Sequence, residues 1–375
     1  MQARERGPRD KPGGQKPAAA QPMRLRLNVF VLHTLDFDRS KLFGPPAPKI
    51  EGVGEALVEL DGQYRALREE AGFNRLARGL IVVQGADAVE YLQGQLTNDI
   101  EALEPGGGCY AVLLDRKGRM QSDMRVLCLT AGELWIEVEP EAVAVVTRHL
   151  TMYSVGRDVT VEDRTGTQAT FTLAGPALSG LTGLAPLSRE HDHTAVVLDG
   201  ISARSIRTRL GLDLIVATND ADAMQTALSE RSLAAVDEAA LEILRVESGT
   251  PRFGREMTTE TIPQEAGINE RAVSFTKGCY IGQETVARLH YKGKPNRHLR
   301  GLVLDSPVQA GDLVKNSDRD LGAIGTAVLS PVRGPIALAI LRREALPGEA
   351  VTVAPTDRTD RPAVPAQVVE LPFGN

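Results

Sequence analysis

The 375-residue sequence has few cysteines, few aromatic residues and no long apolar run. Its three cysteines, at positions 109, 128 and 279, include no Cys-x-x-Cys pair, and an odd number in a chain of this length argues against a disulfide framework. We therefore expect a reducing, cytoplasmic location. No apolar stretch approaches the roughly 20 residues that a transmembrane helix needs, so no membrane partner is expected.

An excess of positive charge and several familiar motifs are also missing. The net charge of −6 argues against a broad nucleic-acid-binding surface, so no direct nucleic-acid partner is predicted, although a local basic patch is compatible with this charge. No Gly-Lys-Ser/Thr follows the glycines at 106–108, and neither a Gly-x-Ser-x-Gly motif nor a dinucleotide-binding fingerprint occurs. His191-Asp192-His193 has metal-ligand residue types but no third ligand at a suitable spacing, which favours a polar loop and no metal site.

The chain begins with a segment of low complexity. Residues 1–22 are rich in Pro, Gly, Gln, Arg and Ala without periodicity, which predicts disorder. The run Gly44–Pro48 is typical of a linker. We therefore interpret residues 1–47 as an atypical N-terminal extension.

Hydrophobic periodicity then predicts helices alternating with strands. The strand–glycine–helix pattern at 81–87 recurs at 171–177, which indicates two lobes of similar α+β construction. The predicted helices cover 64–76, 86–96, 141–150, 221–230 and 237–247, and the predicted strands cover 79–83, 110–114, 120–129, 134–138, 194–198, 201–207 and 212–217.

The last third of the chain has a different pattern of hydrophobic and turn-forming residues. Residues 250–272 show little periodicity and form a candidate for a long ordered loop of functional importance. After Pro295, short strands separated by Gly and Pro predict a small antiparallel barrel. The expected domains are a first lobe at 48–165, a second lobe at 166–292 and a barrel at 297–375.

The most unusual chemistry lies in the eight residues Lys277–Glu284, which combine a cation, a thiol, a phenol, an amide and a carboxylate with two glycines. Gly278 predicts a turn and residues 283–289 predict a helix, so Cys279 would lie just before a helix N-terminus and two residues from Lys277. Both features stabilise a thiolate. A small buried cysteine in a tight turn fits the same spacing, as we expect for Cys109 and Cys128 in their apolar strands.

Two further features are candidates for a functional role. Asp99 stands beside Asn98 at the end of a predicted helix, where a carboxylate faces the negative pole, although a surface Asx turn fits equally well. A basic stretch suggests an anionic ligand or partner, and a solvated linker face is its alternative. Against Glu284 alone, this stretch contains Lys277, Arg288, Lys292, Lys294, Arg297 and Arg300.

The segment 277–284 resembles the signature of the YgfZ-type folate-binding proteins, relatives of the aminomethyltransferase (T-protein) of glycine cleavage. The stretches at 85–100, 245–252 and 262–267 resemble other conserved blocks of that family. The resemblance extends from about residue 60 to the end. It implies an α+β fold, a ring of three domains in which two α+β lobes and a C-terminal antiparallel β-barrel surround a central cavity that holds tetrahydrofolate.

The resemblance also implies site residues. Asp99 would lie beside the folate ring nitrogens, and Cys279 would be the signature cysteine that the T-protein lacks. The charge and spacing of Lys277 predict that it activates Cys279. The remaining candidates for binding the folate are Asn98, Arg252, Tyr280, Gln283, Glu284 and Arg288, with the arginines directed at its anionic tail.

Three functions follow from the resemblance. The favoured one is a tetrahydrofolate-binding accessory protein that supports assembly or repair of iron–sulphur enzymes, including tRNA-modifying enzymes, with iron–sulphur client or assembly proteins as partners. The second is a folate-dependent one-carbon transferase. Residues 207–213 lack the Gly-Tyr-Thr-Gly-Glu run that lines the T-protein cavity, which argues against glycine cleavage and leaves enzymatic activity open. The third is a module that only senses folate.

Overall fold

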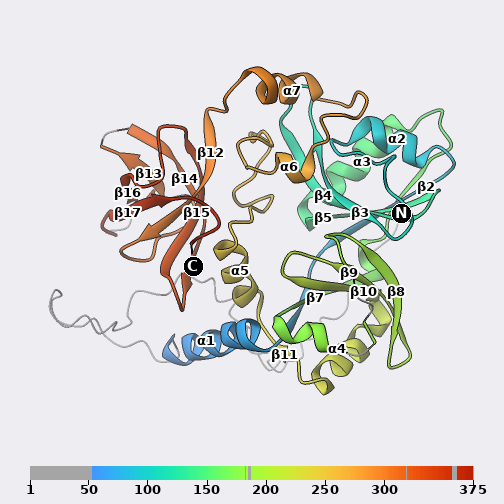
Figure 1. Ribbon diagram of the computed structural model, residues 1–375, viewed down its shortest axis with the longest axis horizontal. Helices are drawn as coiled ribbons and strands as arrows, with labels where there is room; N and C mark the ends of the chain where they lie inside the picture. Colours follow the sequence, from blue (N-terminus) through green and yellow to red (C-terminus); the bar gives the residue numbers. More distant parts are fainter. Residues whose placement is uncertain (1–52, 182, 185–186, 318, 357–360, 375) are drawn as a thin grey trace, which may run out of the picture.

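The computed structural model describes residues 53–181, 183–184, 187–317, 319–356 and 361–374. Within these residues the chain forms two mixed lobes and a β-barrel (Figure 1). The predicted disorder of residues 1–22 and the linker at 44–48 lie outside the described residues. No helix in the described part of the chain is both long and apolar enough to cross a membrane.

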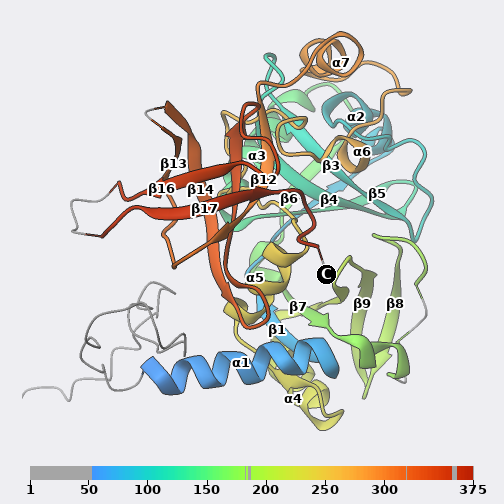
Figure 2. The ribbon, with the colours of Figure 1, turned by 60° about the vertical axis from the view of Figure 1, so that its left-hand side comes forward.

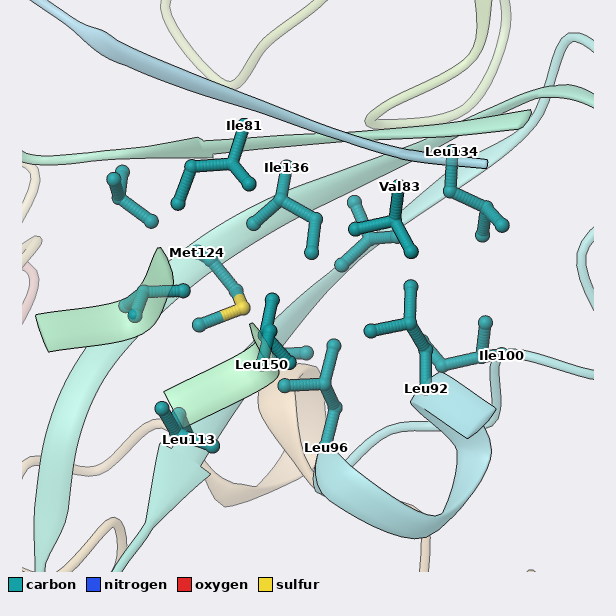
Figure 3. Close-up of a cluster of buried hydrophobic side chains, with 14 of the residues drawn as sticks. Ile81, Val83, Leu92, Leu96, Ile100, Leu113, Met124, Leu134, Ile136 and Leu150 are labelled. Atoms are coloured by element: carbon teal, nitrogen blue, oxygen red, sulfur yellow. The ribbon is translucent and has the colours of Figure 1, made fainter. Parts of the chain in front are cut away.

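The first lobe is an antiparallel five-stranded sheet covered by two helices. Figure 3 shows the apolar side chains of its core, in which Leu92 from one helix, Leu96 directly after that helix and Leu150 from the other helix face Ile81 and Ile136 on the sheet. The strand order is β3-β4-β5-β2-β6, and the elements are β2 (Gly79–Gln84), α2 (Ala88–Gln95), β3 (Gly108–Leu114), β4 (Met120–Thr130), β5 (Glu133–Val138), α3 (Val143–Tyr153) and β6 (Thr160–Asp163).

The second lobe is a six-stranded sheet of order β11-β1-β7-β10-β9-β8. Its core surrounds Phe171 and Leu214, with Met224 from the covering helix. The elements are β1 (Gly72–Leu76), β7 (Gln168–Ala174), β8 (His193–Leu198), β9 (Ile201–Arg207), β10 (Gly211–Ala217), α4 (Ala221–Glu230) and β11 (Ala234–Ala235). Short 3₁₀ turns lie at Pro140–Ala142, Thr165–Thr167, Pro176–Gly180 and Thr218–Asp220.

The predicted C-terminal barrel is confirmed. Six antiparallel strands close in the order β12-β15-β14-β13-β16-β17 around an apolar interior. Closure pairs every strand on both sides, so no edge is left open to other chains. The strands are β12 (Arg297–Leu304), β13 (Leu313–Asn316), β14 (Arg319–Ser330), β15 (Gly334–Arg342), β16 (Ala350–Ala354) and β17 (Val364–Val369).

Four helices connect these bodies: α1 (Val53–Glu69), α5 (Glu238–Glu247), α6 (Asn269–Ala272) and α7 (Gln283–Lys292). α5 lies between the second lobe and the barrel, with α1 across its end (Figures 1 and 2). Glu247 on α5 binds the Tyr64 hydroxyl of α1 at 3.0 Å and the Ser330 hydroxyl of the barrel at 2.6 Å. One buried carboxylate therefore joins three elements.

The two lobes exchange segments, so the order of elements along the sequence does not match their grouping in space. The helix predicted at 64–76 ends at Glu69, and β1 follows it and pairs with β7 and β11 of the second sheet. A Cβ at Gly72 would lie 3.0 Å from the carbonyl oxygen of Ala234, so glycine permits this close pairing. The second sheet is thus completed by a strand that precedes the first lobe.

The signature segment at 277–284 follows the second lobe in sequence but packs on the first lobe. Tyr280 and Val286 pack with Val112 and Leu114 of β3 in one apolar cluster. The Thr97 hydroxyl donates to the carbonyl of Ala272 at 2.6 Å. Residues that follow the second lobe in sequence therefore lie on the first, and a division of the chain at residues 165 and 292 does not describe these contacts.

A chain of buried ion pairs begins in the second lobe and crosses the first. The Asp213 carboxylate on β10 accepts Nη1 of Arg125 on β4 at 2.7 Å. Arg125 also pairs with Glu137 on β5, and Glu137 accepts Nε of Arg78 at 2.9 Å. Arg78 in turn pairs with Glu139. Two sheets are thus connected through alternating charges.

The same chain of ion pairs continues to the barrel. Arg252 joins Glu139, at 3.0 Å, to Glu242 of α5 at 3.6 Å. Arg245 pairs with Glu242 at 2.5 Å and with Glu256 at 3.0 Å. Nη2 of Arg245 also donates to the Thr326 hydroxyl of β14 at 2.8 Å. Each charge in the middle of the chain has at least two partners, so removal of one residue deprives each neighbour of one opposite charge in a buried environment.

We expect Arg125→Met to lower the free energy of unfolding by about 3 kcal/mol or more, because it leaves Asp213 and Glu137 short of a buried cation. The matched control is Arg65→Met, whose partner Asp61 and whose own side chain, 63% exposed, lie at the surface. Its cost should be about 0–1 kcal/mol. Urea denaturation of both variants measures the difference, and equal effects would contradict a role for the buried chain.

Candidate functional site

The signature loop is seated by two glycines. Gly282 adopts φ +84°, and a Cβ there would lie 2.5 Å from the carbonyl oxygen of Asp115. On the opposing hairpin turn, a Cβ at Gly118 would lie 2.9 Å from Thr285. Larger residues at either position would separate the turn from the start of α7. The predicted hairpin turn and the predicted helix are therefore packed directly on each other.

Cys279 is exposed at the mouth of a groove just before α7. The groove has a volume of about 530 Å³. It is lined by Arg116, Tyr153 and the six residues Cys279, Tyr280, Ile281, Gly282, Gln283 and Glu284. The thiol is therefore open to a partner, and three of the predicted binding residues accompany it. A buried cysteine, the alternative fitted by the spacing, is not what the fold produces at 279.

Lys277 anchors the signature loop to α2. Its Nζ donates to the carbonyls of Gln93, Leu96 and Asn98 at 2.6, 2.8 and 2.7 Å. A cation at this place stabilises the carbonyl-rich end of a helix. An ammonium group has three donors, and within the described residues these carbonyls use all three, which leaves none for Cys279. Its contacts are those of an anchor.

Asp99 and Asn98 lie at this anchor and not in the groove. The Asp99 carboxylate accepts Nε2 of Gln93 at 2.9 Å, and the amide of Asn98 donates to the carbonyls of Tyr110 and Arg271 at 2.8 and 2.9 Å. Burial lowers the pKa of Lys277 to about 8, and the charge of Asp99 counters part of that effect. The structure thus brings Asp99, Asn98 and Lys277 together. None of the three lines the groove around Cys279, but the Lys277 ammonium lies 5.3 Å from the ring centre of Tyr280, which does.

The two arginines predicted to bind the folate tail, Arg252 and Arg288, have different surroundings. Arg252 belongs to the buried chain of ion pairs, held by Glu139 and Glu238. Arg288 is exposed on α7. The contacts of Arg252 are therefore structural, whereas Arg288 is accessible to a ligand or partner.

A second site, which we call the interlobe polar cluster, consists of Arg78, Tyr110, Asp123, His191 and Arg271. The Tyr110 hydroxyl donates to Asp123 at 2.6 Å, and the guanidinium carbon of Arg271 lies 4.9 Å from the centre of the Tyr110 ring. Nη2 of Arg271 also binds Glu190 of the second lobe at 2.5 Å. Strands β3 and β4 thus present the cluster to the loop before β8.

Burial is the largest influence on the pKa values of Asp123, Tyr110 and His191 in this cluster. Burial raises the pKa of Asp123 in spite of the Tyr110 hydroxyl and the Arg78 cation, and burial raises the pKa of Tyr110 well above its usual value. Burial also lowers the pKa of His191 to about 3, with the Arg125 and Arg271 cations adding to the effect. Yet these side chains are only half-buried. These side chains are therefore partly desolvated and still accessible to solvent.

The cluster also holds buried donors without partners. Nε of Arg271 within the cluster and Nε of the neighbouring Arg125 have no hydrogen-bond partner among the described residues, and neither has Nδ1 of His191, which donates or accepts according to its tautomer. An unpaired buried donor costs about 1–3 kcal/mol, and native proteins satisfy most of them with protein, water or ligand. Donors and the Asp123 carboxylate at one place suit a ligand that carries both acceptors and N–H groups.

The sequence contained a signal for this cluster that the motif reading missed. Asp123 and Arg125 stand at alternate positions of the predicted strand at 120–129, which places two charges on one face. Charges on a buried strand are rare unless paired or functional. His191 was assigned to a polar loop, and that loop docks on the first lobe, where the His193 amide donates to the carbonyl of Gly106 at 2.7 Å.

The comparisons with known proteins agree with this architecture. The family model described as the GCVT N-terminal domain matches residues 59–277, more than half of the chain. A tRNA-modifying protein YgfZ from Yersinia pestis is 33% identical over 231 residues, which are 60% of this chain and 68% of that protein. This chain belongs to the YgfZ-type, GCVT-like family. The resemblance inferred from the signature is thereby confirmed.

Two aminomethyltransferases extend the comparison of this YgfZ-type chain. The one from Thermus thermophilus is 29% identical over 327 residues, 83% of this chain and 89% of that protein. The crystal structure of glycine cleavage system aminomethyltransferase T from Bartonella henselae superposes with a TM-score of 0.74 at 22% identity, covering 84% of this chain and 89% of that one. The fold of two mixed lobes and a barrel is shared.

We expect His191 to make the folded state sensitive to acid. The unfolded chain gains a proton there near pH 6.5, whereas the folded protein does so only near pH 3, so its stabilising effect is complete above 6.5 and is lost as the pH falls towards 3. Between pH 7.5 and 5.5, urea denaturation should show wild type losing about 1 kcal/mol more stability than His191→Gln. Between pH 7.5 and 8.5 the two should not diverge, and parallel profiles below 6.5 would contradict the burial of a neutral imidazole.

Proposed function

We propose that this YgfZ-type protein binds tetrahydrofolate at the interlobe polar cluster and supports the assembly or repair of iron–sulphur enzymes through Cys279. The observation that carries the first half is the set of unpartnered buried nitrogens on Arg125, Arg271 and His191, in the region of the Asp123 carboxylate. The exposed thiol in its groove supports the second half. A cytoplasmic location, where cysteines stay reduced, accompanies this proposal.

The residues of the cluster fit the chemistry of a folate. Its pterin is flat and carries N–H groups and acceptors, and its glutamate tail is anionic. Asp123 would accept from the pterin N–H groups, Tyr110 would offer an aromatic surface, and the guanidinium groups of Arg271 and Arg125 would donate to acceptors or carboxylate oxygens. Arg78, held by Glu137 and Glu139, would keep these side chains in place. When bound, the folate would supply a carrier for one-carbon units.

Cys279 would supply the chemistry of the second site. A thiolate is a soft ligand that suits iron–sulphur clusters, and an exposed one can serve as a transient ligand or as a nucleophile towards sulphur. The groove beside it, bordered by Arg116 and Tyr153, is open enough for a segment of a client protein. Relatives named as tRNA-modifying proteins support tRNA-modifying enzymes as clients.

The two sites would communicate through β3. This strand carries Tyr110 in the polar cluster, and its next inward residues, Val112 and Leu114, pack against Tyr280 beside the thiol. A ligand that orders Tyr110 would therefore stabilise the strand on which the signature rests. Folate occupancy would in this way favour the conformation in which Cys279 meets its client.

One observation favours a second function, a folate-dependent one-carbon transferase. Burial raises the pKa of the Asp123 carboxyl, which favours its protonated form. It could then move a proton to or from an amine donor of the one-carbon unit. Formation of methylene-tetrahydrofolate from glycine or a methylamine donor by the purified protein is the assay for this function.

Titration with tetrahydrofolate distinguishes the cluster from the anchor around Asp99. We expect Asp123→Asn to weaken binding by tenfold or more, about 1.4 kcal/mol, because the amide cannot accept at both positions from N–H groups. Asp99→Asn, of the same size and charge change, should bind like wild type. The reverse order of effects would place the folate at Asp99 and overturn the assignment to the cluster.

Complementation tests the thiol separately from folate binding. In cells without their own copy, Cys279→Ala should abolish support of iron–sulphur enzyme activity while tetrahydrofolate binding stays unchanged. The matched control is Cys109→Ala, since burial raises the pKa of Cys109 to about 12 and keeps it a thiol. Full activity of cells carrying Cys279→Ala would exclude the thiol from the function.

A further inference from the structure

We propose that the outer side of α7 binds single-stranded nucleic acid through stacking and phosphate contacts. This α7 surface consists of Phe275, Arg288, His290, Tyr291, Lys292 and Lys294. α7 lies at the periphery of the molecule, between the first lobe and β12 (Figures 1 and 2). Neither the folate proposal nor the role of Cys279 uses these side chains.

Three aromatic rings on this surface form a stacked group. The Phe275 and His290 rings lie 3.7 Å apart at 16°, and Tyr291 meets both edge-on, at 6.2 and 4.9 Å between ring centres. Phe275 is half-buried and supports the group from below, while 66% of Tyr291 is exposed. A rigid base under an exposed ring is the arrangement on which a nucleobase stacks.

Unpaired positive charge surrounds these rings. Arg288, Lys292 and Lys294 are exposed, and within the described residues none forms an ion pair. Residues 285–294 contain no aspartate or glutamate. In a chain whose net charge is −6, such a segment produces a local positive field that attracts a polyanion. The overall charge excludes only a broad nucleic-acid surface, which is why the sequence alone predicted no such partner.

Helix stabilisation explains only part of this arrangement. Cations in the last turn favour the negative end of a helix, which accounts for Lys292. It does not account for a tyrosine held two-thirds exposed on a helix whose one fully buried side chain is Val286. An aromatic ring at the surface among cations matches the composition of single-strand-binding sites better than that of a solvated helix face.

The stacked aromatic rings and the unpaired cations together indicate the kind of partner. An acidic protein segment would use the cations but not the exposed ring face, and a duplex hides the faces of its bases. A single strand uses both, since its bases are free to stack while its phosphates meet Arg288, Lys292 and Lys294. α7 begins at Gln283, which lines the groove at Cys279, so a bound strand would lie beside the thiol.

Fluorescence anisotropy on the full chain tests this proposal. The probes are labelled single-stranded RNA and DNA of the same mixed sequence of about 12 nucleotides and the matching duplex, each at about 50 and 200 mM salt, a range that separates phosphate contacts. We expect both single strands to bind, more weakly at the higher salt, and the duplex to bind at least tenfold more weakly. A difference between RNA and DNA would show whether the 2′-hydroxyl is recognised.

Variants separate stacking from charge. Tyr291→Ala should weaken single-strand binding about tenfold, whereas Tyr291→Phe should retain it. The double change Lys292→Gln and Lys294→Gln should weaken binding and flatten its salt dependence, whereas Arg209→Gln, an exposed cation of the second lobe, should change neither. Thermal unfolding checks that each variant is folded.

Three results would overturn the proposal. They are absence of single-strand binding by wild type, binding that all α7 variants retain, and binding that polyglutamate displaces equally well from wild type and Tyr291→Ala. The last result would indicate an acidic protein partner held by charge alone.

Discussion

The buried chain of ion pairs from Asp213 to Glu256 is the constraint on which the rest of this structure depends. It contacts both sheets, α5 and, through Thr326, the barrel. Such pairs contribute little net stability compared with apolar packing, because desolvation offsets their attraction. What they supply is a fixed geometry, since a displaced domain would leave several buried charges without partners. The mutual position of the three bodies is therefore set electrostatically.

This rigid frame explains why the interlobe polar cluster can keep unsatisfied donors. The carboxylates of Glu137 and Asp213 are held by Arg78 and Arg125, so they cannot turn to accept from the free nitrogens of their neighbours. The stability of the surrounding structure offsets the free-energy cost of these unpaired groups, as is common at binding sites. A ligand with complementary groups would form the missing hydrogen bonds and regain this free energy, which is the physical basis for assigning the folate to this position.

Much of the fold was accessible from local patterns. The hairpin at 115–118, the strands of the barrel and the helices at 221–230 and 237–247 appear as predicted, because turn residues and hydrophobic periodicity act over short distances. The helix predicted at 64–76 was partly wrong, since residues 72–76 form a strand. Their partners, β7 and β11, lie about 100 and 160 residues away, and no local pattern contains that pairing.

The sequence by itself determined the family signature, the presence of a cysteine before a helix and the concentration of basic residues around it. Only the tertiary structure decided that Cys279 is exposed, that Lys277 is bound to three carbonyls in the last turn of α2 and just after it, and that Asp99 does not line the groove. It also decided that Asp123, His191 and Arg271 form one cluster. The reason is that exposure, pairing and desolvation depend on which distant segments meet, whereas a motif specifies only what its own residues are able to do.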